Sequence, residues 1–400
     1  MVFLNWRDCQ NPEAGGSEVY VETVARALAA GGNDVSLFAA AFPGAESEQA
    51  VGGVRVVRGG SKLTVYPTAL RALAGGALGR PDVVVDVQNG IPFGSRLVSG
   101  VPTVVLVHHV HREQWPVVYG PVRSRIGWWA ESRVAPRLYR GSQYVAVSEA
   151  TRSELAGLGV DRGRIEVVRN GVQASPPRCA LRSSTPRVLV LGRLVPHKQV
   201  EHVIRAAAAL RAHVPGLRVS VVGDGWWRDE ARAEASRVGA ADIVEFHGFV
   251  DDATKQRELA RAWVLAVPSL KEGWGLVVTE AAAHEVPSIA YRSAGGVTES
   301  IGHGESGLLV DGGEEGFTAA LRRVLLDDGL RAALARGAAH RAAALSWQAT
   351  ADAFGEVLGR VIGRPVDVGR VTVESSLDPG DPSHTRRGRQ VLDRPVQDWP

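Results

Sequence analysis

The stretch LKEGWGLVVTE, residues 270–280, places Glu272 and Glu280 eight positions apart around a short turn that contains glycine. An apolar run, Val264 to Val267, precedes it, so the pattern predicts a buried strand, a loop and then a helix that begins near Gly275. A helix entered through glycine presents free backbone N–H groups and the positive end of its dipole, which is the environment that a diphosphate needs. The two carboxylates would flank that anion and accept sugar hydroxyls, so the stretch predicts a sugar-nucleotide site. Taken alone, the pair has a plainer interpretation, in which Glu280 is a helix-start charge and Glu272 a solvated loop residue.

A second segment, GRLVPHK at 192–198, favours the site. It follows the apolar run Val188 to Leu191, so Arg193 and Lys198 are expected at the carboxyl end of a strand, where open α/β sheets bind ligands. Two cations at such a place can clamp a diphosphate, because arginine supplies a bidentate fork and lysine a point charge. The alternative is a pair of solvated positive charges at the start of a helix.

The two glutamates match the E-x7-E motif of the retaining glycosyltransferases of family 4, and the chain resembles that family over roughly residues 1–362. The resemblance implies an α/β protein with the GT-B fold, in which two Rossmann-like, doubly wound domains face an interdomain cleft. The matching segments follow in the family's order: GRLVPHK at 192–198, VVGDGWWRDE at 221–230, FHGFV at 246–250 and SAGGVTESIGHGESGLLV at 293–310.

The resemblance also implies roles for the matching residues. Arg193 and Lys198 would hold the donor diphosphate and stabilise the departing nucleotide. Glu272 would contact the transferred sugar, and Glu280 would bind the ribose hydroxyls. No enzymic base is assignable, and the family's front-face route lets the departing phosphate oxygen deprotonate the acceptor. The other donor-binding positions expected in this half are Gly192, Gly223, Gly248, Val250, Gly273, Trp274, Gly275 and Leu276.

Near the amino terminus, a short strand at 2–6 precedes AGGSEVYVETVARALAAGGNDVSLF at 14–38. Gly15 and Gly16 open an amphipathic helix, and a second glycine pair ends it. Glycines let the backbone approach an anion closely. The segment resembles the family's amino-terminal loop, which implies that Gly15 and Gly16 contact the donor phosphate and sugar. The spacings of the dinucleotide fingerprint and of the P-loop are both absent.

A third candidate is VVLVHHVH at 104–111, where an apolar run predicts a buried strand and His108 follows its end. The resemblance implies that His108 faces the reacting sugar, where it would position the donor or shield developing charge, with His109 as the alternative and as a donor contact. Three histidines within four residues also suggest a metal site, but the sequence has no other plausible ligand cluster. A structural histidine is the remaining interpretation. The family implies no metal and no cofactor for the chemistry, with the nucleoside diphosphate sugar as co-substrate.

Length and patterning predict two domains. The chain has 400 residues, of which 45% are hydrophobic, and valine-rich runs alternate with helical stretches rich in alanine and arginine, as in α/β units with parallel sheets. We expect an acceptor domain at 1–172, a nucleotide-sugar domain at 187–345, a helix at 346–362 that crosses back to the first domain, and a flexible tail at 363–400. The expected strands, besides 2–6 and 264–267, lie at 83–87, 104–107, 144–147, 188–191, 219–222, 243–246 and 288–291.

The charge balance, +3 with a pI near 9.0, is no nucleic-acid signature by itself. The segment at 111–141 is more distinctive, because it carries six arginines against two glutamates, interleaved with tryptophan and tyrosine. Such a segment could attach the first domain to an anionic membrane surface or line an acceptor pocket. The alternative is ordinary helix packing with the arginines in solvent.

No run of eighteen apolar residues is present, and the chain begins with a core strand, so we expect neither a membrane span nor a signal peptide. Cys9 and Cys179 are the two cysteines, which favours a reducing cytoplasm. The pair Asp251 and Asp252 is interpreted as a helix cap rather than a metal motif.

The resemblance, supported by these patterns, implies a retaining hexosyltransferase that uses a UDP- or GDP-linked sugar and a hydroxyl acceptor such as an envelope lipid, a glycan or a natural product. The composition resembles that of high-GC actinobacterial proteins. Three alternatives stay open: a sugar-nucleotide epimerase, a glycan phosphorylase of the same architecture, and a non-catalytic nucleotide-sugar-binding partner subunit.

Overall fold

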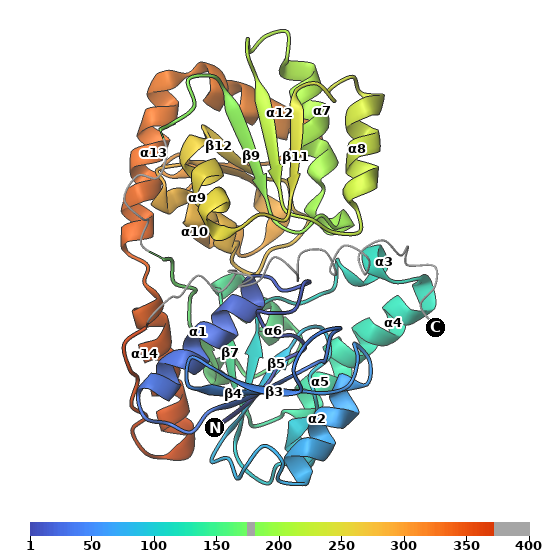
Figure 1. The fold of residues 1–400 in the computed structure, drawn as a ribbon, viewed down its shortest axis with the longest axis vertical. Helices are drawn as coiled ribbons and strands as arrows, with labels where there is room; N and C mark the ends of the chain where they lie inside the picture. Colours follow the sequence, from blue (N-terminus) through green and yellow to red (C-terminus); the bar gives the residue numbers. More distant parts are fainter. Residues whose placement is uncertain (174–180, 372–400) are drawn as a thin grey trace. The chain divides into compact units, whose positions relative to one another are not determined.

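The computed structural model describes residues 1–173 and 181–371, which form two compact units (Figure 1). The first unit contains Met1–Gly171 and the segment that begins at Ser346, and the second contains Val172–Leu345. The chain therefore enters the second unit after Gly171 and returns to the first after Leu345. Each unit is an α/β layer structure with its own sheet.

The first unit is built on an eight-stranded sheet in the order β3-β4-β2-β1-β5-β6-β7-β8. All neighbouring strands are parallel except β3 and β4, which are antiparallel. Alternate residues of the central strand face opposite layers, as the pleat requires. On one face, the ring centroids of Phe3 and Phe354 lie 6.2 Å apart. On the other face, Val2 and Leu4 belong to the apolar cluster that α2 covers. The strands are β1 Val2–Leu4, β2 Ser36–Ala39, β3 Glu48–Val51, β4 Val54–Arg58, β5 Val84–Gln88, β6 Thr103–Val107, β7 Gln143–Ala146 and β8 Ile165–Val167.

The helices of the first unit cover both faces of this sheet, and α1 and α14 lie side by side (Figure 1). As the sequence predicts, α1 begins after Gly15 and ends at Gly31, and its apolar side is buried. The α-helices are α1 Gly16–Ala30, α2 Val65–Ala74, α3 Trp115–Val118, α4 Pro121–Trp129, α5 Ala135–Leu138, α6 Glu149–Gly157 and α14 Trp347–Ile362. Shorter turns are η1 Ser95–Leu97, the π-helical η2 Ala130–Val134 and η3 Arg162–Arg164.

The chain beyond α14 corrects one expectation, because the residues up to 371 are held against α1 and α14 instead of starting a flexible tail at 363. The amide of Gly369 donates to the Ala27 carbonyl at 2.9 Å, and the amide of Val371 donates to the Gln348 side chain at 2.8 Å. Sequence composition suggested a tail because the chain from 364 onward has few apolar residues, whereas the stretch is held by backbone hydrogen bonds and by an ion pair of Arg364 with Asp82. The rest of the expected tail, 372–400, lies outside the described residues.

The second unit has a six-stranded sheet in the order β11-β10-β9-β12-β13-β14, and every neighbouring pair is parallel. All four residues of β12 are buried, as expected for a strand covered on both faces. The strands are β9 Arg187–Leu191, β10 Arg218–Val222, β11 Val244–Gly248, β12 Val264–Val267, β13 Ser288–Tyr291 and β14 Gly307–Val310.

Two helical layers enclose this sheet (Figure 1). Helix α7 packs against α8 and α12, while α10 packs against α9 and α13. Asp251 caps α9 by accepting a hydrogen bond from the Thr254 amide at 2.7 Å, which confirms the capping interpretation. The α-helices are α7 Val200–Leu210, α8 Arg228–Arg237, α9 Asp252–Arg261, α10 Leu276–Ala283, α11 Val297–Ser300, α12 Gly313–Leu326 and α13 Asp328–Ala343, with short 3-10 turns η4 Pro196–Lys198 and η5 Arg292–Ala294.

In the part of the chain that the structure describes, no helix is both long and apolar enough to cross a bilayer.

Candidate active site

The loop that joins β12 to α10 has the predicted form. Gly275 takes a left-handed conformation, with φ of +82°, and α10 begins at the next residue. The amides of Leu276 and Val277 in the first turn make no hydrogen bond within the described residues. Because an α-helix leaves its first N–H groups without intrahelical partners, these two amides are available to an anion.

Two motifs that are far apart in the sequence meet at this loop. The Lys198 ammonium lies 2.5 Å from the Glu272 carboxylate, and the Ser269 hydroxyl donates to the same oxygen at 2.7 Å. The backbone ties the two loops as well, since the Leu270 amide donates to the His197 carbonyl at 2.8 Å. Lys198 and Glu272 therefore form an ion pair and are not separate, solvated charges. Arg193 lies in the same loop as Lys198, two residues beyond β9, and is half-buried.

The predicted glycines of this unit bring three strand ends close together. The Gly192 amide donates to the Val222 carbonyl at 3.0 Å, and the Gly223 amide donates to the Gly248 carbonyl at 2.8 Å. A Cβ on Gly223 would lie 2.0 Å from the Gly192 oxygen, so no side chain fits there. Val250, two residues past the end of β11, is half-buried and packs on the core of the unit. The carboxyl ends of β9, β10 and β11 thus form a surface of bare backbone.

Glu280 has a partner that sequence analysis missed. The Lys255 ammonium, from α9, lies 3.1 Å from Glu280 and 2.9 Å from Asp252. Burial alone would lower the pKa of Lys255, but the charges of Glu280 and Asp252 and their hydrogen bonds raise it to about 12. Lys255 is therefore charged throughout the physiological range and holds Glu280 in place. The only local signal was the i,i+3 spacing of Asp252 and Lys255, which does not point to Glu280.

The glycines at the start of the motif loop are packed tightly against η5 and α11. The Glu272 amide donates to the Ala294 carbonyl at 2.8 Å, and the Gly296 amide donates to the Glu272 carbonyl at 2.9 Å. A Cβ on Gly296 would lie 1.7 Å from the Gly273 oxygen. Trp274 is buried beside them, and its indole nitrogen has no hydrogen-bond partner among the described residues.

In the first unit, His108 stands directly after β6, as predicted, and is buried. Its ring meets Tyr20 edge-on, with 5.4 Å between the ring centroids. Burial lowers the pKa of His108 to about 4, against the opposing charge of Glu18, so the imidazole is neutral at pH 7. Its Nε2 atom is buried and has no partner among the described residues. His109 differs, because its Nε2 lies 2.9 Å from the Gln114 side-chain oxygen.

The glycine turn before α1 is closed by a residue that sequence analysis also missed. The Gly15 amide donates to Glu18 Oε2 at 2.7 Å, and the other carboxylate oxygen lies 3.6 Å from Arg7 Nε. Glu18 is fully buried. The Gly15 amide is therefore already bonded within the chain, whereas Gly16 begins the helix. The signal was a glutamate three residues after the cap position, the usual partner of the cap amide.

Two other features of the described residues bear on the expectations. No group of three or more histidine, cysteine, aspartate or glutamate side chains in the described ranges is arranged to hold a metal ion. The Cys9 thiol is buried, and burial together with the nearby Glu22 charge raises its pKa, while Cys179 lies outside the described residues.

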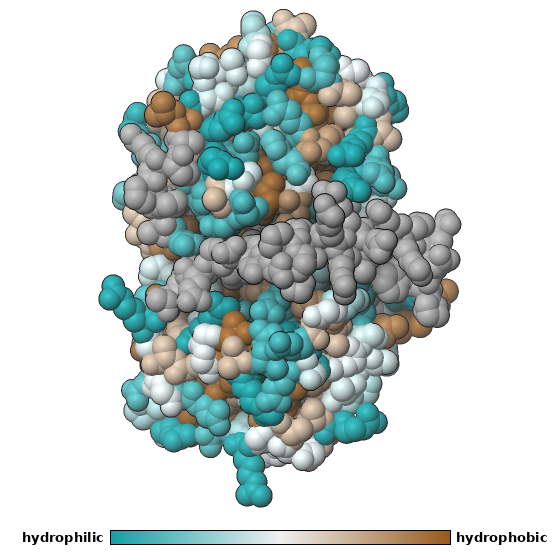
Figure 2. Space-filling model, viewed as in Figure 1, coloured by the Kyte–Doolittle hydropathy of each residue, from teal (hydrophilic) through white to brown (hydrophobic). Residues whose placement is uncertain are grey.

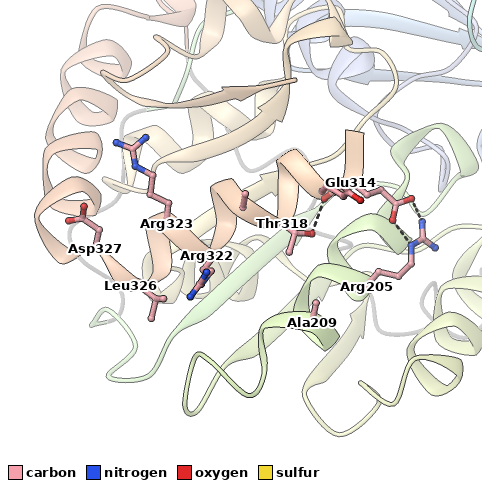
Figure 3. A pocket seen from close by; sticks show the side chains of 10 residues that line it. Arg205, Ala209, Glu314, Thr318, Arg322, Arg323, Leu326 and Asp327 are labelled. Carbon is pink, nitrogen blue, oxygen red and sulfur yellow. Dashed lines mark hydrogen bonds and ion pairs between the residues drawn. The ribbon is translucent and has the colours of Figure 1, made fainter. Parts of the chain in front are cut away.

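A hollow of about 780 Å³ lies elsewhere, on the outer side of α7 and α12 (Figure 3). Arg205 and Glu314 form an ion pair at its edge, with 2.6 Å between Nε and Oε2, and Arg322 and Arg323 leave α12 in different directions. None of the predicted site residues lines this hollow.

Comparisons with known proteins agree with the motif order. Residues 14–175 match the family described as Glycosyltransferase Family 4, and residues 174–341 match Glycosyl transferases group 1. A D-inositol 3-phosphate glycosyltransferase of Acidothermus cellulolyticus is 32% identical over 383 residues, which cover 85% of this chain and 84% of the relative. A GDP-mannose-dependent alpha-(1-6)-phosphatidylinositol monomannoside mannosyltransferase of Mycolicibacterium smegmatis is 30% identical, covering 84% of this chain and 92% of the relative.

Solved structures show the same architecture. A sucrose-phosphate synthase from Thermosynechococcus elongatus superposes with a TM-score of 0.78 at 21% identity, covering 90% of this chain and 98% of the other. This likeness concerns the fold, and together with the two parallel-sheet units it establishes the GT-B fold that the sequence predicts.

Proposed function

The chain belongs to the group 1 glycosyltransferases of family 4, and we propose that it transfers a hexose from a nucleoside diphosphate sugar to a hydroxyl acceptor with retention of the anomeric configuration. Glycosyl transfer itself follows from the family. The nature of the donor, the stereochemistry and the acceptor are the proposal.

The observation that carries the proposal is the contact of Lys198 with Glu272, in the loop that leads into α10 and its unbonded first amides. A diphosphate placed there would contact the Lys198 ammonium and the amides of Leu276 and Val277, with Arg193 in the same loop. Negative charge grows on the leaving diphosphate as the glycosidic bond breaks, so preorganised donors stabilise the transition state more than the ground state. Each such contact is worth about 3 kcal/mol.

Glu272 and the departing phosphate have the two other roles, which are contact with the transferred sugar and removal of the acceptor proton. Glu272 would accept a hydroxyl of the transferred sugar, and its ion pair with Lys198 fixes the direction of both side chains. The acceptor approaches from the face that the leaving group vacates, so a phosphate oxygen takes the acceptor proton while the new C–O bond forms. This route retains the anomeric configuration and needs no enzymic base.

Glu280 would bind the two ribose hydroxyls of the nucleotide. Its carboxylate oxygens can accept hydrogen bonds from two hydroxyls, and the charged Lys255 ammonium at 3.1 Å fixes the position of the side chain. The bare backbone at Gly192, Gly223 and Gly248 would let the nucleotide approach the strand ends closely.

In the first unit, His108 and the turn at Gly16 are the proposed contacts of the donor sugar. Because His108 is neutral, it would act through a hydrogen bond at its unbonded Nε2 and not as an imidazolium. His109 is the weaker candidate, since Gln114 already occupies its ring nitrogen.

The relatives' names guide the choice of substrates to try. One relative is named for GDP-mannose and a phosphatidylinositol mannoside, and another for inositol 3-phosphate. We therefore propose UDP- or GDP-linked hexoses as donors and an inositol-containing or lipid-linked hydroxyl as acceptor. We place the reaction in the cytoplasm and propose that cationic side chains, without a bound metal, neutralise the leaving group.

A turnover assay tests the proposal. The protein is incubated with UDP-glucose or GDP-mannose and a panel of polyol and lipid acceptors, and nucleoside diphosphate release and the anomeric coupling of the product are followed by NMR. We expect acceptor-dependent release and an α-linked product from an α-linked donor. A β-linked product contradicts retention, donor conversion without acceptor indicates an epimerase, and a requirement for inorganic phosphate indicates a phosphorylase. Donor binding without any turnover indicates a non-catalytic subunit.

A further inference from the structure

The orientation of α4 is fixed by one side of the helix. A Cβ on Gly127 would lie 2.4 Å from the Trp115 ring, so α4 packs on this indole more closely than any other residue would allow. Ser124 is buried on the same side, and Trp128 packs on the apolar cluster beneath it. The inner side of α4 is therefore fully packed against the rest of the unit.

The opposite side of α4 is apolar and has no cover among the described residues. Val122, Ile126 and Trp129, at positions i, i+4 and i+7, form one stripe along the helix. Their exposed fractions are 69%, 59% and 60%. Hydrophobic side chains are visible at the edge of the molecule where α4 lies (Figure 2). Ordinary helix packing, the alternative for this segment, accounts for Gly127 and Trp128 but leaves these three apolar side chains exposed.

The stripe is flanked by positive charge. Arg123, Arg125 and Arg133 are exposed, and none of their side chains makes a hydrogen bond or ion pair with any residue in the described ranges. Glu131 offers them no neutralisation, because it is buried and accepts hydrogen bonds from the His111 amide at 3.0 Å and the Trp115 indole at 2.7 Å. An exposed apolar stripe inside a set of unpaired arginines is the surface that an interfacial helix presents to anionic lipid.

We propose that this surface, formed by Val122, Ile126 and Trp129 with the flanking Arg123, Arg125 and Arg133, docks the first unit onto the headgroup region of an anionic lipid bilayer. Trp129 is suited to the interface because its ring is apolar while its indole N–H is polar. The arginines suit the phosphate groups of the lipids because guanidinium binds phosphate in a bidentate manner. A nine-residue helix is too short to span a bilayer, so α4 would lie along the surface.

The docking surface is fastened to the strand end that carries the histidines. Glu131, which follows α4, holds both His111 and Trp115, and His111 lies three residues after His108. A membrane bound to α4 would therefore lie at a fixed position relative to the carboxyl end of β6. The inference does not depend on the proposed donor chemistry, because lipid binding is measured without any nucleotide.

Vesicle flotation with the full chain tests the proposal. Vesicles of phosphatidylcholine alone are compared with vesicles that contain about 30% phosphatidylglycerol, at low and high salt. We expect binding to the anionic vesicles, reduced by salt. Arg123→Gln combined with Arg125→Gln should weaken binding about 25-fold, since each arginine near an anionic surface contributes about a fivefold change. Ile126→Ser combined with Trp129→Ser should weaken binding at both salt concentrations.

The matched control is Arg322→Gln combined with Arg323→Gln on α12, beside the exposed Leu326. This variant loses the same two charges from another exposed helix, and we expect its vesicle binding to match that of the unaltered chain. Equal weakening by the two arginine pairs would overturn the proposal, because it would mean that net charge and not the α4 surface binds lipid.

Two further outcomes would overturn it. If a chain that ends at Val371 loses lipid binding while the α4 variants keep it, the segment 372–400 is the lipid-binding element. If the α4 substitutions change the sedimentation coefficient without lipid and leave flotation unaltered, the stripe is an interface between copies of the chain. Amide hydrogen exchange tests the proposal without any variant. Anionic vesicles should slow exchange in α4 of the unaltered chain, and unchanged exchange there would contradict the proposal.

Discussion

At the scale of single residues, the ion pair between Lys198 and Glu272 is the centre of the proposed chemistry. Lys198→Ala should lower kcat by about 100- to 1,000-fold, because one preorganised contact to the leaving group is lost. The unfolding free energy should fall by about 1 to 3 kcal/mol, because the Lys198 and Glu272 side chains are only 24% and 12% exposed, while Ser269 still donates to the remaining carboxylate. Steady-state kinetics and thermal unfolding measure the two effects.

The control for this variant is Arg211→Ala, which breaks the exposed pair of Arg211 with Asp242 at the far end of α7. Its turnover should equal that of the unaltered protein. A folded Lys198→Ala protein with near-normal turnover would remove Lys198 from the mechanism.

The buried His108 gives a prediction about pH. The unfolded chain binds a proton at this residue below about pH 6.5, whereas the folded chain does so only below about pH 4. Stability from the neutral imidazole is therefore complete above pH 6.5 and is lost as the pH falls toward 4, by about 3 kcal/mol in all. Urea unfolding between pH 4 and 7 gives the unfolding free energy of the protein and of His108→Gln at each pH. We expect this free energy to change less steeply with pH in the variant. An NMR titration that gives His108 an ordinary pKa would contradict this account.

Sequence reasoning proposed Glu272 and Lys198 as ligand contacts, but it missed the residues that pair with Glu280 and with the Gly15 turn. Glu272 and Lys198 belong to contiguous motifs, each next to a strand end, so the sequence pattern predicts both. Lys255 and Glu18 were missed for a physical reason. Lys255 reaches Glu280 across two packed helices, 25 residues apart, and Glu18 lies beside Arg7 only because β1 and α1 fold together.

At the scale of elements, the packing of the motif loop against α11 makes a prediction about Gly296. A Cβ there would lie 1.7 Å from the Gly273 oxygen, and both groups are backbone, so the loop must move. Gly296→Ala should destabilise the protein by about 2 to 4 kcal/mol and displace Glu272. Chemical denaturation measures the change.

Gly329→Ala serves as the comparison in the same unit. This glycine is the second residue of α13, and a Cβ there would lie 3.4 Å from its nearest neighbour, Asp327 Oδ1, which is an ordinary contact. Alanine in a helix should stabilise the protein by about 0.5 to 1 kcal/mol. Equal effects of the two substitutions would mean that the close approach at Gly296 has no energetic consequence.

Elements whose pattern is set by burial were predicted well, and elements set by other forces were not. The bounds of β12 follow from a continuous apolar run, because a strand buried on both faces is rich in apolar residues. The hairpin of β3 and β4 was missed, since β3 alternates between exposed and half-buried residues and contains few apolar ones. The segment after α14 was missed because it is held by backbone hydrogen bonds and by a long-range ion pair of Arg364 with Asp82, which leave no periodic pattern in the sequence.

At the scale of the whole molecule, two parallel-sheet units of similar construction divide the chain, and the second completes its core without the first. The residues proposed to bind the ribose and most of those proposed to bind the diphosphate lie in the second unit, whereas Gly15 and Gly16 lie in the first. Nucleotide affinity should therefore fall when second-unit residues such as Glu280 are replaced. This holds even in a variant that has already lost sugar transfer. We propose that acceptor choice depends on the loops of the first unit, where sequence patterns carry little chemical information.

Calorimetric titration with UDP and with GDP tests the central claim most directly, on the unaltered chain and on Glu280→Ala. In that variant Lys255 keeps Asp252 at 2.9 Å, so no buried charge is left unpaired. The account predicts that one of the two nucleotides binds, that at 100 times its Kd it stabilises the fold by about 2.7 kcal/mol, and that Glu280→Ala weakens it about tenfold, as expected for the loss of charged hydrogen bonds. Binding of neither nucleotide, or equal affinity in the variant, would contradict the assignment of this site.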